Sequence, residues 1–259
     1  MAKTKKGLGQ NWLSDQESLL AMVQAARVAS GDQVLEIGPG LGYLTDKLLA
    51  AKAEVLALEF DQDLIPQLQK KYDGSSNLSL QQGDIRTFDL SGLPADYKIC
   101  ANIPYYLSAN LLRILTDTLN KPSVVALMVQ KEVAQKVAAP VGKRSMLATL
   151  VQAQYYASVG TVVPADLFQP PPKVDSQILI LSRRSEALVA PDGWPELARL
   201  IKLAFSNPRK KLRSNLSAGL QLDKTQTDDL LGRASIDLAS RAEQLTGQQW
   251  LELHRALKA

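Results

Sequence analysis

The stretch VLEIGPGLGYLT, from Val34 to Thr45, decides the fold of this 259-residue chain. It joins a short apolar run to a helical pattern through a loop with glycine at positions 38, 40 and 42. In an open parallel sheet such a loop follows the first strand, at the edge where ligands bind. Glycine allows positive φ and lets a ligand approach the backbone without meeting a β-carbon. The stretch therefore predicts an α/β sheet with a binding site at this turn, and a tight turn without a ligand is the alternative.

Outward from this loop, apolar runs of strand length alternate with helical patterns, as in a parallel sheet that is covered on both faces. Ser14 and Glu17 fit a capping box at the start of the first helix. Two late apolar runs are joined by a proline-rich loop, which favours an antiparallel pair that closes the sheet. The expected strands are 34–37, 55–59, 78–80, 97–101, 124–129, 159–163 and 178–181, and the expected early helices are 14–29, 44–51 and 61–72.

The C-terminal part differs from the rest in pattern and in charge. Strand signals stop after Arg183, so we expect an α/β domain over residues 1–185 and a small all-α domain over residues 186–259. Lys and Arg number 17 against 17 Asp and Glu up to residue 182, and 13 against 9 afterwards, so the net charge of +4 belongs to the last part. Its segment PRKKLR, 208–213, suits either a polyanion partner or a solvated helix face.

The composition argues against several kinds of chemistry. The only cysteine, Cys100, lies in an apolar run, so no internal disulfide forms and catalytic thiol chemistry is not expected. The only histidine, His254, lies far from every motif, which argues against a metal site and a Ser-His-Asp triad. Neither a transmembrane run nor a signal-peptide pattern is present, so we expect a soluble cytoplasmic protein without a membrane partner.

The glycine spacing separates two kinds of nucleotide site. A dinucleotide site needs a third glycine at position 43, but Tyr43 stands there and the third glycine is Gly42. Glu36 and the compressed glycine pattern instead resemble the first motif of S-adenosylmethionine-dependent methyltransferases. S-adenosylmethionine is therefore the expected cofactor, and the backbone at Gly38 and Gly40 is expected to contact it.

Acidic residues follow the next two strands. Glu59 ends the second strand, where a carboxylate can accept both ribose hydroxyls, although capping of the next helix is the alternative. Asp84 follows the third strand and is expected to accept a hydrogen bond from the adenine amino group, with Ile85 packed on the ring. A loop and two acids at successive strand ends fit a nucleoside cofactor.

The stretch NIPYY, Asn102 to Tyr106, follows the fourth strand and is expected beside the same site. It resembles the motif of methyltransferases that modify exocyclic amino groups of bases. The Asn102 side-chain oxygen and the Ile103 carbonyl would accept both N–H groups of an adenine N6 and turn this poor nucleophile toward the methyl group. Pro104 fixes the carbonyl's direction, and Tyr105 offers a face for stacking on a base that has left its stack. An ordinary proline turn is the alternative.

The resemblance extends over nearly the whole chain, which is similar to the ribosomal RNA adenine N6,N6-dimethyltransferases of the small-subunit type. The segments that carry it are LGQNWL (8–13), VLEIGPGLGYLT, LEFD (58–61), GDI (83–85), NIPYY, FQPPPKVDS (168–176) and PRKKLRSNL (208–216). The resemblance implies that Phe168 helps to sandwich the target base. It implies cofactor contacts by Asn11, Leu13, Gly38, Glu59, Asp84 and Asn102.

The family also implies a fold and a substrate. The fold is a Rossmann-like class I methyltransferase sheet, mostly parallel with a terminal antiparallel pair, followed by a helical RNA-binding domain. The substrate is two adjacent adenosines in a hairpin loop near the 3′ end of small-subunit (16S) rRNA, dimethylated within an immature 30S-type subunit by a monomer. RNA binding is expected of Arg209, Lys210, Lys211 and Arg213.

Three other functions stay open from the sequence. A large-subunit rRNA methyltransferase of the antibiotic-resistance type shares the site, although PPPKVDS and the C-terminal helices favour the small-subunit group. A non-catalytic relative that binds nucleic acid is a second possibility, and the intact Asn102 and Gly38 argue against it. A nicotinamide oxidoreductase is the most distant. Arg144 and Ser145 stand where Tyr-Gly is common in the family, which leaves the RNA contacts open.

Overall fold

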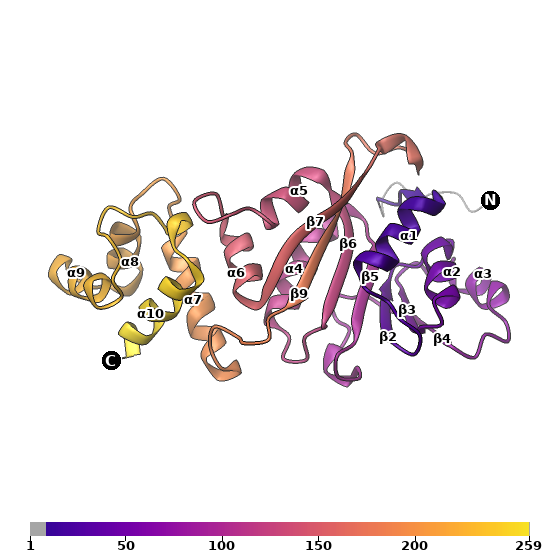
Figure 1. The fold of residues 1–259 in the computed structure, drawn as a ribbon, viewed down its shortest axis with the longest axis horizontal. Coiled ribbons are helices and arrows are strands. Elements are labelled where there is room, and N and C mark those ends of the chain that lie inside the picture. Colours follow the sequence, from indigo (N-terminus) through magenta and orange to yellow (C-terminus); the bar gives the residue numbers. More distant parts are fainter. Residues whose placement is uncertain (1–8, 259) are drawn as a thin grey trace. The chain divides into compact units, whose positions relative to one another are not determined.

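A computed structural model describes residues 9–258, and these residues form two compact units (Figure 1). Residues 9–135 and 156–183 make up the first unit, and residues 136–155 and 184–258 make up the second. Leu8, the first residue of the LGQNWL segment, lies outside the described residues.

The first unit is built on a seven-stranded sheet of order β4-β3-β2-β5-β6-β9-β7 (Figure 1). Neighbours from β4 to β6 are parallel, and β9 is antiparallel to β6. The predicted Rossmann-like sheet with an antiparallel end is therefore confirmed. Its strands are β2 (Gln33–Ile37), β3 (Glu54–Glu59), β4 (Leu78–Gln82), β5 (Lys98–Asn102), β6 (Val124–Gln130), β7 (Tyr155–Val163) and β9 (Ser176–Arg183).

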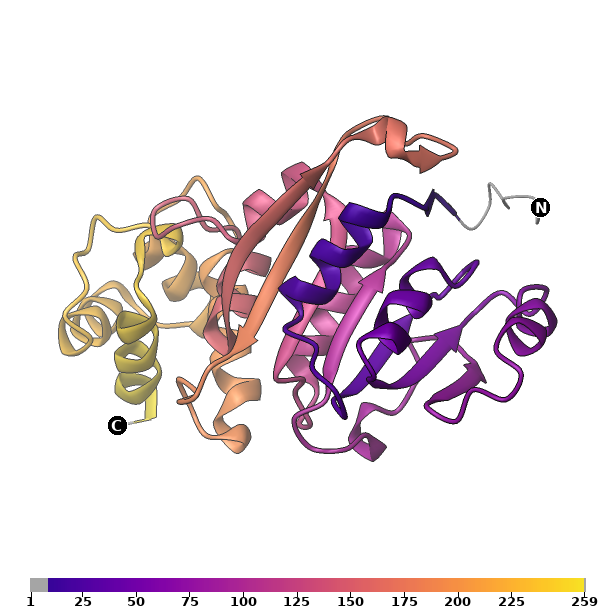
Figure 2. The same cartoon turned by 45° about the vertical axis from the view of Figure 1, so that its right-hand side comes forward.

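Helices cover both faces of the central strands, which explains why β6 is a continuous apolar run. All but the last of its residues are buried. On one face Leu19, Met22 and Leu48 pack against Val34 and Cys100, and α1 lies against β6 and β9 (Figure 2). The Cys100 thiol is a fully buried core side chain, as its apolar surroundings predicted. The helices of this unit are α1 (Gln16–Ala25), α2 (Tyr43–Ala50), α3 (Ile65–Lys71), α4 (Ser108–Asp117) and most of α5 (Lys131–Val137).

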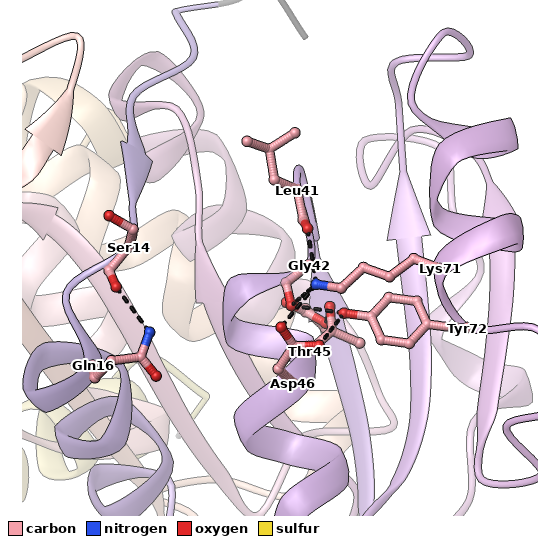
Figure 3. A network of polar contacts seen from close by, with 9 residues as sticks. Ser14, Gln16, Leu41, Gly42, Thr45, Asp46, Lys71 and Tyr72 are labelled. Atoms are coloured by element: carbon pink, nitrogen blue, oxygen red, sulfur yellow. Dashed lines mark hydrogen bonds and ion pairs between the residues drawn. The ribbon is translucent and has the colours of Figure 1, made fainter. Parts of the chain in front are cut away.

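The start of α1 differs from the prediction by one residue. Asp15, not Ser14, is the N-cap, and its carboxylate accepts a hydrogen bond from the Ser18 backbone N–H at 2.8 Å. The Ser14 carbonyl accepts from the Gln16 side chain at 2.9 Å instead (Figure 3). The predicted capping box of Ser14 and Glu17 is wrong because both residue types can cap, and the extended backbone ends at Asp15.

A short ribbon that the sequence did not predict joins two distant segments. In it β1 (Trp12–Leu13) pairs antiparallel with β8 (Phe168–Gln169), so that Leu13 lies opposite Phe168. Both of these side chains are buried in the same apolar core as α1 and α2. The pairing fixes the segment before α1 to the loop between β7 and β9.

The second unit is a helical cluster around one apolar core. Its centre contains Leu150, Leu197, Phe205 and Trp250, and the Phe205 and Trp250 rings stack at a centroid distance of 6.3 Å. Residues 136–155 group with this unit because Leu150 and Ala153 belong to its core. The predicted domain boundaries, with one domain over residues 1–185 and another over residues 186–259, stay a prediction. The helices are α6 (Met146–Gln154), α7 (Trp194–Ala204), α8 (Leu212–Leu220), α9 (Lys224–Arg233) and α10 (Gly247–Lys258).

Over residues 9–258, no helix combines the length and the apolar character needed to span a membrane.

Candidate active site

A cavity in the first unit lies at the carboxyl ends of parallel strands β2, β3, β4 and β5. The chain folds this way because the carboxyl ends of parallel strands meet at one edge of a sheet. Segments that the sequence singled out separately thereby share one wall. They are residues 9–13, the glycine loop, the end of β3, residues 83–86 after β4, and NIPYY after β5.

The glycine loop takes a backbone conformation that side chains disfavour. Gly38, Gly40 and Gly42 have φ of 70°, 59° and 81°. The Gly38 N–H donates to the Leu58 carbonyl at 2.9 Å, and the Gly42 N–H donates to the Pro39 carbonyl at 2.8 Å. These bonds connect the loop to β3 and close its turn. Gly38 and Gly40 line the cavity, so a ligand there would meet backbone and no β-carbon.

Glu59 is a buried carboxylate that joins the loop to the end of β3. Its Oε2 accepts from the Gly40 N–H at 3.0 Å, and its Oε1 accepts from the Asp61 N–H at 2.7 Å. Burial is the main cause that raises the pKa of Glu59, and these two backbone donors oppose the increase. The carboxylate lines the cavity and has lone pairs left. It therefore orders the turn after β3 and is also available to ribose hydroxyls.

Glu36 is the most buried acid of the cavity wall, with 1% of its surface exposed. Its Oε2 accepts from the Thr45 hydroxyl at 2.6 Å, whereas its Oε1 has no hydrogen-bond partner among the described residues. Burial, with the Glu59 and Asp46 carboxylates acting in the same direction, raises the pKa of Glu36 to about 8. A buried acceptor without a partner fits a cationic ligand, which would also favour the ionised carboxylate. The sequence placed Glu36 in the motif but did not predict this role.

Asp84 carries a partner that sequence reasoning missed. Its carboxylate accepts from the Arg86 Nε at 2.8 Å and from the Arg86 backbone N–H at 2.9 Å. The Arg86 side chain holds the pKa of Asp84 below its usual range, so the carboxylate is ionised at neutral pH. Ile85 between them is buried and lines the cavity. An Asp-x-Arg spacing was the only available signal for this pair, and a surface arginine is common enough to hide it.

The NIPYY segment is held at the rim of the same cavity. Asn102 is the last residue of β5, and Ile103 is buried beside it. The Tyr105 hydroxyl lies 2.6 Å from the Ser176 hydroxyl on β9, which fixes the orientation of the ring. Tyr106 is 59% exposed. The motif thus has a fixed half and an open half, and the partner Ser176 is 71 residues away in sequence.

Residues 9–13 contact both sides of the cavity. The Gln10 side chain donates to Asp61 Oδ2 at 3.1 Å, and a β-carbon at Gly9 would lie 3.4 Å from the Tyr106 ring. Asn11 and Leu13 both line the cavity, and Leu13 is buried. The structure therefore brings Asn11 and Leu13 together with Gly38, Gly40, Glu59, Asp84, Ile85, Asn102 and Tyr105.

Phe168 and the basic residues lie elsewhere. Phe168 is 3% exposed, packs in the apolar core with Leu13, and is absent from the cavity wall. In the second unit Arg209, Lys210 and Lys211 are exposed in the turn before α8, whereas the fourth predicted residue, Arg213, forms an ion pair with Asp228 of α9. Over residues 9–258, no group of three or more His, Cys, Asp or Glu side chains is arranged to hold a metal ion.

The family model of ribosomal RNA adenine dimethylase matches residues 1–258. The chain belongs to this family. The resemblance expected from the motifs is confirmed, and with it an S-adenosylmethionine-dependent rRNA adenine dimethyltransferase activity. A nicotinamide site, already disfavoured by Tyr43, is set aside.

Known proteins and solved structures are similar to this chain over nearly the full length. The ribosomal RNA small subunit methyltransferase A of Gloeobacter violaceus is 40% identical over 262 residues, which cover 98% of this chain and 93% of that protein. The Nostoc sp. protein of the same name is 36% identical and covers 99% of both. A dimethyladenosine transferase from Plasmodium falciparum has a TM-score of 0.80 at 28% identity, covering 93% of this chain and 95% of its own. The 23S rRNA methyltransferase ErmE has a TM-score of 0.77 at 25% identity, covering 96% and 100%.

Proposed function

We propose that this chain transfers methyl groups from S-adenosylmethionine to N6 of two adjacent adenosines in a hairpin loop near the 3′ end of 16S rRNA. The observation that carries this proposal is one cavity wall in which Asn102 and Ile103 stand beside Glu36, Glu59 and Asp84. A nucleoside cofactor and the acceptors for an exocyclic amine thus share one space. Relatives called small subunit methyltransferase A are 36–40% identical over nearly the whole chain, which supports the small-subunit substrate.

Different residues of the cavity wall would bind different parts of the cofactor. Glu59 would bind the ribose hydroxyls, and Asp84 would accept from the adenine amino group while Ile85 packs on the ring. The partnerless Oε1 of Glu36 suits the positive charge of the cofactor. S-adenosylmethionine supplies an electrophilic methyl group on a sulfonium. Asn11 and Leu13 would cover it from the N-terminal segment, and the backbone at Gly38 and Gly40 would approach it closely.

The motif NIPYY would prepare the nucleophile. The Asn102 side-chain oxygen and the Ile103 carbonyl accept the two N6–H groups, which holds the nitrogen toward the methyl group. The N6 lone pair would take the methyl group, with S-adenosylhomocysteine as the thioether product, and the nitrogen would lose its proton to water. No strong base is needed because the amine becomes acidic as it acquires the methyl group. The ring of Tyr105, fixed by Ser176, offers the stacking face for the flipped base, and Phe168 would complete the sandwich if the β1–β8 ribbon moved.

The basic turn before α8 is the part of the second unit that best suits RNA. Arg209, Lys210 and Lys211 are exposed and form no ion pair with another described residue. Arg213 is engaged by Asp228 and would contribute less. The partner would be an immature 30S-type subunit in the cytoplasm, bound by a monomer.

A large-subunit methyltransferase is the second candidate, because ErmE, a 23S rRNA methyltransferase, has the same fold over 96% of this chain. Complementation separates the two. The chain is expressed in a bacterial strain that lacks its own 16S rRNA adenine dimethyltransferase, and nucleosides from separated 16S and 23S rRNA are measured by mass spectrometry. Dimethyladenosine restored in 16S rRNA alone is the expected result, and its appearance in 23S rRNA alone would reverse the assignment. The Asn102→Ala variant is the matched negative control.

A further inference from the structure

Two side chains that do not line the cavity contact the glycine loop at Leu41 and Gly42. Lys71 is the last residue of α3 and Tyr72 follows it, and neither lines the cavity. The Tyr72 hydroxyl lies 2.7 Å from the Gly42 carbonyl oxygen, and the Lys71 ammonium lies 3.2 Å from the Leu41 carbonyl oxygen (Figure 3). The glycine loop therefore lines the cavity on one side and contacts the end of α3 on the other.

Asp46 connects these two side chains to α2. Its carboxylate oxygens lie 2.7 Å from the Lys71 ammonium and 2.7 Å from the Tyr72 hydroxyl. The ammonium also lies 5.0 Å from the centre of the Tyr72 ring and 5.9 Å from that of Tyr43, a residue of the cavity wall. One residue before Asp46, Thr45 donates to Glu36. The first turn of α2 thus joins the buried acid of the cavity to the pair Lys71 and Tyr72.

The geometry explains the compressed glycine spacing. A β-carbon at position 42 would lie 2.3 Å from the Tyr72 hydroxyl, and the φ of 81° would strain any other residue as well. Gly42 is a glycine because Tyr72 occupies the space beside it. The peptide group is planar and trans, so a carbonyl held on one side points its N–H to the opposite side. The Gly42 carbonyl also accepts from the Asp46 N–H of α2 at 3.0 Å. Together with Tyr72, this bond fixes the Tyr43 N–H, the first amide of α2, which points away from Tyr72 and has no partner within its own helix.

We propose that Tyr72 and Lys71 are positioning residues for the cofactor, which hold the turn at Leu41 and Gly42 in its binding conformation without touching the ligand. The inference rests on the proposed function, since it assigns these residues to the S-adenosylmethionine site. It predicts that removal of the Tyr72 hydroxyl loosens the loop and weakens binding, while the core of the unit stays intact.

The test compares two tyrosine-to-phenylalanine variants of the full chain. Tyr72→Phe keeps the ring but loses the hydroxyl. Tyr97→Phe is the matched control, because its hydroxyl also bonds a backbone carbonyl, that of Asn120 at 3.2 Å, and lies outside the cavity wall. Calorimetry measures the dissociation constant of S-adenosylhomocysteine, and hydrogen exchange measures protection of residues 38–46 without ligand. We expect Tyr72→Phe to weaken binding about tenfold and to expose the loop amides to exchange, with both properties unchanged in Tyr97→Phe.

Equal affinity of Tyr72→Phe and the wild type, with equal loop exchange, would overturn the proposal. An equal loss of affinity in both variants would also overturn it, because the effect would then be one of general stability. Lys71→Met, a change of an exposed side chain, covers the case in which Tyr72→Phe does not fold, and about threefold weaker binding is expected. If the wild-type chain itself binds no S-adenosylhomocysteine, the proposed cofactor fails, while loop exchange in the ligand-free variants still decides whether Tyr72 holds the loop.

Discussion

The glycine loop of the first unit and the basic turn of the second are both loops that precede a helix, but they differ in how firmly their polar groups are held. In the glycine loop, Glu59 accepts from the Gly40 N–H at 3.0 Å, and the Tyr72 hydroxyl lies 2.7 Å from the Gly42 carbonyl oxygen. The segment that carries the basic turn is anchored by buried Asn215, whose amide donates to the Asn207 carbonyl at 3.0 Å and to the Ala204 carbonyl, at the end of α7, at 2.6 Å. Its cations extend into solvent. A small cofactor needs a loop whose atoms are fixed, whereas a phosphate backbone needs charge that adapts to it.

Asn102→Ala should have the largest effect and would show that the cavity of the first unit carries the chemistry. Removal of one positioned polar group should slow methyl transfer by about a hundredfold or more, while the fold stays intact and RNA still docks. Single-turnover assays on immature small subunits, with nucleosides resolved by mass spectrometry, measure the rate. Partial variants such as Asn102→Asp should accumulate monomethyladenosine, because the second transfer starts from an amine with one N–H fewer. Near-normal dimethylation by Asn102→Ala would remove the proposed mechanism.

Glu59→Ala tests directly whether the held glycine loop binds the cofactor. The change removes charge-assisted bonds to the ribose and also releases the Gly40 N–H, so cofactor binding should weaken by about 1–3 kcal/mol. Calorimetry with S-adenosylmethionine and S-adenosylhomocysteine measures the loss. Glu54→Ala, at the opposite end of the same strand, is the control and should bind normally. Unchanged affinity in Glu59→Ala would mean that the ribose lies elsewhere.

Replacement of Arg209, Lys210 and Lys211 by Gln tests whether the basic turn binds RNA. RNA binding should weaken about tenfold, and the slope of log affinity against log salt should fall by up to about 3, since each of the three cations would neutralise one phosphate. Filter binding across a salt series gives both values. Arg213→Gln is the contrasting variant, because loss of its ion pair with Asp228 should lower stability more than RNA affinity. An unchanged slope in the triple variant would identify the turn as a solvated face.

The smallest effect is a pH dependence of cofactor binding that arises at Glu36. Its pKa of about 8 leaves the carboxyl largely protonated at pH 7, whereas a cationic ligand favours the ionised form. Affinity should therefore rise with pH, by about three- to tenfold between pH 7 and 8, and level off above the pKa. Calorimetry in two buffers of different ionisation enthalpy would detect the released proton. Glu36→Gln should abolish the dependence, and a dependence that persists in this variant would assign the proton to another group.

Much of the fold and part of the site could be predicted because the signals are local. The continuous apolar run of β6 requires burial on both faces, and three glycines in five residues require a turn with positive φ. The topology of a parallel sheet then places the end of each strand at one edge, so Glu59, Asp84 and Asn102 had to lie near one another. The sequence by itself thus determined the sheet, the cavity and the residue types that line it.

Only the tertiary structure decided how these residues are held. Tyr72 reaches Gly42 over 30 positions of sequence, and Tyr105 meets Ser176 over 71. The ion pair of Arg213 with Asp228, 15 positions apart, likewise has no local signal. The physical reason is that a side-chain hydrogen bond forms only when donor and acceptor are placed to within a few tenths of an ångström. The packing of distant segments sets these positions. Periodicity and spacing describe which residues face a site, and packing alone determines which of them are free to act.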